Sequence, residues 1–218
     1  MNWFLYLSLF IIFLSYISSL RVFRLDMPLL FRQFSFFLLF VLLGEVFGIA
    51  WSKKIYQFTP FSRNNQWFYN FFHLFSYLFY LYFFYKVLQL PGIKKTVKLL
   101  AVFYILFALG NLIFVQGFMQ FNTYTELLAC FIMVFSSIAY YYQLLNGREI
   151  ISLKNDAAFW ISTGVLIYHL GGMMGLFLIN VMNVISNEKA RSIHLIIQVS
   201  AVCMYINFSI AFLCMRRK

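Results

Sequence analysis

The chain contains seven apolar runs that are each long enough to cross a lipid bilayer as a helix. A helix needs about 20 residues to cross roughly 30 Å of hydrocarbon. The runs cover approximately residues 3–20, 29–51, 67–85, 99–117, 127–145, 158–181 and 193–215. Because the runs occupy most of the chain, we expect a single all-α integral membrane domain over residues 1–218, folded as a seven-transmembrane helix bundle.

The composition agrees with a membrane environment. Of the 218 residues, 63% are hydrophobic and 11% are charged, whereas a soluble domain is about 25% charged. The net charge of +11 would suggest nucleic acid as a partner of a soluble chain. Here the basic residues lie almost entirely between the apolar runs, where membrane orientation and anionic lipid account for them. We therefore expect the lipid bilayer, and no nucleic acid, as a partner.

The distribution of lysine and arginine predicts an orientation, since positive charge gathers on the cytoplasmic side. One side of the expected bundle collects Arg21, Arg24, Arg32, Lys86, Lys94, Lys95, Lys98, Arg148, Lys154, Arg216, Arg217 and Lys218. The other side has Lys53, Lys54, Arg63, Lys189 and Arg191. We therefore expect the N-terminus outside and the C-terminus inside. Arginines follow the first run and do not precede it, so we expect an uncleaved helix there and not a signal peptide.

Polar residues inside the runs gather in the expected outer half. Glu45 lies six residues before Trp51 and His73 lies six residues after Trp67, so both sit roughly 9 Å from the outer ends of their helices. The same half contains Asn70, Asn111, Glu126, His194 and Gln198. Because such groups are costly in lipid, they predict an outward-facing pocket for a ligand or a proton. The alternative is that they hold helices together or simply collect near the interface.

Two pairs of glycines predict close helix packing. Gly44 and Gly48 flank Glu45, and Gly171 and Gly175 follow His169. Small residues four apart allow helix backbones to approach each other in a membrane. Two interpretations stay open for His169: protonation or ligand contact changes a helix crossing, or the ring is a core histidine that donates to a carbonyl group.

Residue patterns of several membrane enzymes and transporters are missing from the sequence. It has no HxxxH pair, no aspartate inside an apolar run, no lysine in the last run for a Schiff base, and no Pro-Gln pair. Cys130, Cys203 and Cys214 lie inside apolar runs and lack metal-ligand spacing. We therefore expect no catalytic residues, no cofactor and no metal site, with a lipid-modifying activity as the alternative.

Four segments carry a resemblance to known proteins. They are NQWFYN at 65–70, followed by an aromatic run, FNTY at 121–124, SSIAYYYQLL at 136–145 and AFWISTGVLIY at 158–168. With them the chain resembles a group of uncharacterised bacterial seven-helix inner-membrane proteins, which are similar to the membrane-embedded input regions of sensor histidine kinases. The resemblance covers most of the chain. It implies sensing or signal relay and a place in the bacterial inner, or cytoplasmic, membrane.

The loops between the runs are short, so we expect the protein to act within the bilayer or through a partner. Our main hypothesis is a sensor-like or accessory membrane protein that relays a signal to a separate protein. Two basic segments are candidate docking sites for a partner or for anionic lipid: a loop with Lys94, Lys95 and Lys98, and the tail with Arg216, Arg217 and Lys218.

The alternative function is a small transporter, channel or pore-forming effector in which Glu45 and His73 line a path. Such a path needs polar positions that continue into the inner half of the membrane. The sequence supplies few of them, chiefly Tyr141, Ser162 and Asn207.

Overall fold

The computed structural model describes residues 2–58, 64–147, 153–182 and 187–215, with the side chains of 2–3 and 177–194 left out. Its long helices are α1 (Asn2–Ser19), α3 (Leu29–Lys53), α4 (Gln66–Val87), α5 (Pro91–Gly110), α6 (Thr123–Asn146), α7 (Ala157–Met182) and α8 (Asn187–Cys214). Shorter elements are α2 (Arg21–Arg24), two 3-10 turns (Ile55–Phe58 and Leu153–Asn155) and a π-helical turn (Asn111–Val115). The described residues contain no strand, which confirms the all-α class.

Six of the described helical segments are long and apolar enough to cross a membrane. They are Phe4–Arg24, Leu29–Lys53, Pro91–Val115, Thr123–Asn146, Ala157–Leu176 and Leu195–Cys214. The chain is therefore a multi-pass integral membrane protein. Helix α4 is not among the six, and it carries several tyrosines together with Asn70 and His73. A seventh span and the orientation of the bundle stay predictions.

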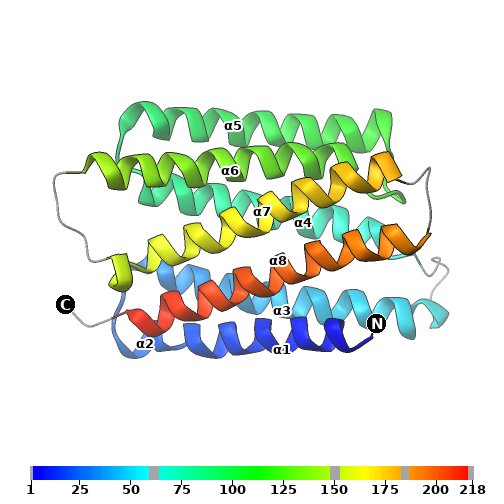
Figure 1. Ribbon diagram of the computed structural model, residues 1–218, viewed down its shortest axis with the longest axis horizontal. Coiled ribbons are helices and arrows are strands. Elements are labelled where there is room, and N and C mark those ends of the chain that lie inside the picture. Colours follow the sequence, from blue (N-terminus) through cyan, green and yellow to red (C-terminus); the bar gives the residue numbers. More distant parts are fainter. Residues whose placement is uncertain (1, 59–63, 148–152, 183–186, 216–218) are drawn as a thin grey trace.

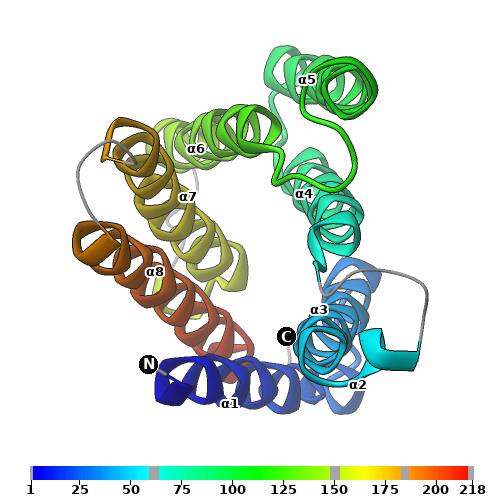
Figure 2. The ribbon, with the colours of Figure 1, turned by 90° about the vertical axis from the view of Figure 1, so that its right-hand side faces the viewer.

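The long helices lie side by side, and successive helices run in opposite directions (Figure 1). Seen end-on, α1, α3, α4, α6, α7 and α8 form a ring in that order (Figure 2). Each packs against its neighbours, and the ring closes where α8 packs along α1. Helix α5 lies outside the ring, where it contacts α4 and α6.

Glycines bring α7 close to α8. A Cβ atom at Gly164 would lie 2.9 Å from the carbonyl oxygen of Met204, and one at Gly171 would collide with the Ser200 side chain. Small residues at such positions let two membrane helices approach until their backbones touch. The helix that packs closely at Gly171 is therefore α8.

An aromatic layer fills one end of the ring. The Phe34 ring on α3 packs against the rings of Phe83 on α4 and Phe208 on α8, at centroid distances of 5.5 and 5.2 Å. Phe34, Phe83, Phe208 and Phe212 have no exposed surface. Edge-to-face pairs of this kind add to the stability that comes from burial alone. The layer closes the end of the bundle where α8 ends.

The structure corrects one boundary. A loop was expected at Lys94, Lys95 and Lys98, but α5 begins at Pro91, so these lysines lie in its first turns. Proline is well tolerated at the first position of a helix, because the N–H group there has no intrahelical partner. The Lys94 ammonium group lies over the ring of Tyr85, 5.3 Å from its centroid.

Candidate functional site

A central cavity of about 330 Å³ lies inside the ring, next to the aromatic layer. Its walls come from α1, α3, α4, α7 and α8. The polar lining residues are Ser8, Glu45, Tyr69, His73, Ser76, Tyr77, Tyr80, Tyr168, Gln198 and Tyr205. The apolar ones are Leu5, Leu9, Ile12, Val41, Ile49, Phe72, Ile197, Ala201 and Met204.

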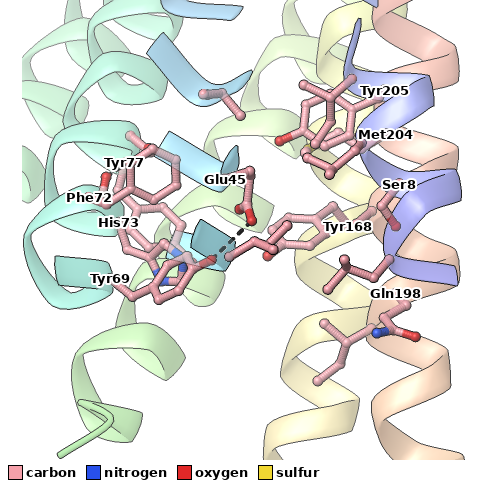
Figure 3. A pocket seen from close by; sticks show the side chains of 18 of the residues that line it. Ser8, Glu45, Tyr69, Phe72, His73, Tyr77, Tyr168, Gln198, Met204 and Tyr205 are labelled. Carbon is pink, nitrogen blue, oxygen red and sulfur yellow. Dashed lines mark hydrogen bonds between the residues drawn. The ribbon is translucent and has the colours of Figure 1, made fainter. Parts of the chain in front are cut away.

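Polar groups lie on two opposite sides of the cavity (Figure 3). Glu45 on α3 and Tyr69, His73 and Tyr77 on α4 lie on one side, while Gln198 on α8 lies across from them. The lining therefore combines one carboxyl group, one imidazole and several phenol rings with aliphatic side chains. A mostly apolar cavity with a few convergent polar groups is typical of small-molecule sites.

The glycines beside Glu45 bring α4 close to it. A Cβ atom at Gly44 would collide with the Phe72 ring, and one at Gly48 would collide with the Tyr69 side chain. Both glycines are buried. Because neither has a side chain, the Tyr69 hydroxyl reaches the carboxyl group and donates to Glu45 Oε2 at 3.2 Å. This hydrogen bond is drawn in Figure 3.

His73 and Tyr77 on α4 both bind Glu126, which lies in the first turn of α6. His73 Nδ1 lies 2.8 Å from Glu126 Oε1, and the Tyr77 hydroxyl donates to Glu126 Oε2 at 2.6 Å. Glu126 is only 7% exposed. A buried carboxyl group is costly unless its oxygen atoms are paired, and here both have partners. This triad joins α4 to α6 beside the cavity.

His169 on α7 and Tyr104 on α5 both pack against the ring of Tyr77. His169 is fully buried, and its Nδ1 donates to the Val165 carbonyl oxygen at 2.7 Å. Its ring packs edge-on against Tyr80 and Tyr168, with centroids 6.1 and 4.9 Å away. Among the described residues, His169 Nε2 and the Tyr104 hydroxyl have no hydrogen-bond partner.

The other predicted pocket residues, apart from Asn111, fall into three groups. Gln198 lines the cavity with Glu45 and His73. Asn70 does not line the central cavity, and its amide donates to the carbonyl oxygens of Phe118 and Gln120, at 3.0 and 2.9 Å. With Glu126 it lines a much smaller cavity of about 20 Å³. The side chain of His194, like Arg216, Arg217 and Lys218, lies outside the described residues.

The structure does not bring Asn111 to the central cavity. It lies in the π-helical turn after α5, outside the ring, and its amide donates to Gln116 and Thr125, at 2.9 Å in each case. Gly175 is buried in α7.

Sequence reasoning missed several cavity residues. Ser8, Tyr168 and Tyr205 were not selected, and neither was Tyr69, which donates to Glu45. A usable signal was present for Tyr69. It lies four residues before His73 and therefore on the same face of α4, and a phenol hydroxyl in hydrocarbon needs a partner.

Within the described residues, no group of three or more histidine, cysteine, aspartate or glutamate side chains is placed to hold a metal ion. The lining residues offer hydrogen bonds, a carboxyl group and aromatic ring faces to a bound molecule. No family model, no curated protein and no solved structure matches this chain.

Proposed function

We propose that this protein is a sensor-like or accessory membrane protein that binds a small molecule in its central cavity and relays the occupancy to a separate protein partner. The observation that carries the proposal is the cavity itself, at about 330 Å³. Its volume falls in the range of about 300–1,000 Å³ that is usual for small-molecule sites. Its lining mixes a carboxyl, an imidazole and an amide group with apolar side chains.

The position of the cavity supports a receptor more than an open path. The cavity ends at Tyr80, Met204 and Tyr205. The packed aromatic layer begins beyond them, with Phe34 and Phe208. A molecule that enters the cavity meets this layer and stops there. Transport would require Phe34 and its neighbours to separate, which a flux assay in liposomes measures directly.

The ring also offers a means of relay. Because five helices line the cavity, a bound molecule contacts α3 and α4 on one side and α8 on the other. A ligand shifts an equilibrium between two packings only by its difference in affinity for them. We propose that the partner binds at the end of the bundle where Lys94, Lys95 and Lys98 lie, because several basic side chains are grouped there. In a bacterial cell this end would face the cytoplasm.

A cavity-filling substitution tests the proposal. Ala201 lines the cavity on α8, whereas Val199 on the same helix is 45% exposed on the outer surface. We expect Ala201→Phe to block the cavity and Val199→Phe to leave it open. Native mass spectrometry of the protein in mild detergent should then detect a bound small molecule in the wild type and in Val199→Phe, but not in Ala201→Phe.

Two results would contradict the proposal. One is a wild-type protein that carries no bound molecule when it is isolated from its natural membrane. The other is equal occupancy in the wild type and in an Ala201→Phe variant that remains folded.

A further inference from the structure

Glu45 is the carboxyl group in the cavity that lacks a charged partner. Among the described side chains, no lysine or arginine forms an ion pair with it. Its Oε2 accepts the Tyr69 hydroxyl group, and Oε1 has no partner in the described part of the chain. Both oxygens therefore keep much of their capacity to accept hydrogen bonds. A carboxylate held away from water is unfavourable until a cation or a proton neutralises it.

The neighbouring imidazole of His73 does not neutralise the Glu45 carboxylate. His73 is engaged with Glu126 at 2.8 Å, and Tyr77 occupies the other oxygen of Glu126. Even a protonated His73 therefore supplies one positive charge for two carboxyl groups. Glu45 is therefore neutralised either by a proton or by a positive charge from outside the described side chains.

Aromatic rings surround the space in front of Glu45. Tyr69, Phe72, Tyr77, Tyr80, Tyr168 and Tyr205 all line the cavity. The faces of such rings carry partial negative charge and attract ammonium groups, most strongly where water is excluded. A carboxyl group with a surrounding set of aromatic rings is the arrangement that recognises organic ammonium ions.

An organic cation suits the site better than a metal ion does. Metal ions such as calcium need about six to eight oxygen ligands, and among the described residues no three histidine, cysteine, aspartate or glutamate side chains are grouped to hold a metal ion. The apolar part of the lining, which includes Leu9, Ile12 and Ala201, can hold a small hydrocarbon or aromatic body.

We propose that the cavity binds a small monovalent organic ammonium compound, with the ammonium group between Glu45 and the tyrosine rings and the apolar body against α1 and α8. This inference rests on the proposed function, since it names the class of molecule that the cavity takes. It assigns Glu45 as the counter-ion of the ligand and not as a structural group that only joins α3 to α4.

The test compares two probes of equal size, phenethylamine, which is a cation at neutral pH, and its uncharged analogue 2-phenylethanol. Binding to the full chain in lipid nanodiscs is measured by calorimetry, with empty nanodiscs as the blank for partition into lipid. We expect the cation to bind at least about tenfold more tightly than the alcohol, because only the cation gains the carboxylate and ring contacts. This comparison needs no variant and is independent of any folding defect.

A charge-removing variant completes the test. Glu45→Gln keeps the size of the side chain, and we expect it to remove the preference for the cation while the alcohol binds as before. The matched control is Asp26→Asn, which removes a carboxyl group that is paired with Arg32 at the exposed end of the bundle. It should leave the affinities for both probes unchanged.

Each outcome has a separate meaning. A preference for the cation that depends on Glu45 supports the inference. Equal binding of both probes, or a preference that survives Glu45→Gln, overturns it while leaving a ligand-binding cavity in place. Binding of neither probe overturns the inference and also counts against the proposed function.

Discussion

Side chains of α4 that bind Glu126 hold α4 against α6. The Tyr77 hydroxyl group donates to Glu126 Oε2 at 2.6 Å in a buried environment. Tyr77→Phe removes this donor and leaves a buried carboxyl oxygen without a partner, which costs about 1–3 kcal/mol. We expect the free energy of unfolding in mild detergent, measured with urea, to fall by that amount.

The control for this substitution lies on the same helix. Tyr85 is 38% exposed, and its ring remains available to Lys94 after Tyr85→Phe. This variant should unfold at the same urea concentration as the wild type. Equal stability of both variants would show that the hydrogen bond between Tyr77 and Glu126 does not stabilise the fold.

Part of the site could be predicted from the sequence. The distance from a terminal tryptophan gives the depth of a residue along its helix, and on that basis Glu45 and His73 were expected at one depth. Both line the cavity, together with Gln198. Depth does not give the rotation of a helix about its axis. For that reason the pairing of His73 with Glu126, and of Glu45 with Tyr69, was not predictable.

At the scale of the helices, the contact between α7 and α8 depends on glycine. Gly164→Ala would place a Cβ atom 2.9 Å from the Met204 carbonyl oxygen, and main-chain atoms cannot move aside as a flexible side chain can. We expect this variant to lose about 1–3 kcal/mol of stability, which is typical of overpacking. The thermal unfolding temperature in detergent measures the effect.

Gly110 provides the comparison for Gly164. A Cβ atom there would meet nothing within 4 Å, so Gly110→Ala should leave the unfolding temperature unchanged or slightly raised, since alanine favours helix more than glycine does. Equal unfolding temperatures for Gly164→Ala and Gly110→Ala would show that close contact at Gly164 does not stabilise the packing of α7 against α8.

Helix positions were predictable to different degrees. Apolar length located the long helices well, because a run of about 20 apolar residues has few alternatives to a membrane helix. The start of α5 was missed because Lys94, Lys95 and Lys98 interrupt the apolar run, although Pro91 begins the helix before them. The place of α5 outside the ring was not predictable either, since a helix in lipid can be apolar all round. Asn111 consequently does not reach the cavity.

At the scale of the whole molecule, the fold class follows from composition and run length, whereas the ring does not. The ring depends on which faces meet, as at Gly44 against Phe72 and Gly164 against Met204. The result is a bundle with a cavity in one half and the aromatic layer in the other. We therefore expect a small cation to enter the cavity and to be excluded from the aromatic layer.

Cysteine reactivity measures the access of a small cation to both regions. In a background without Cys130, Cys203 and Cys214, single cysteines are placed at Ser8, which lines the cavity, and at Ala211, which is fully buried near the aromatic layer. A trimethylammonium methanethiosulfonate reagent is then added to the protein in lipid nanodiscs. We predict fast modification of Ser8→Cys and no modification of Ala211→Cys over the same time. Equal reactivity at the two positions, or an unreactive Ser8→Cys, would show that the cavity does not admit a small cation in preference to the aromatic layer.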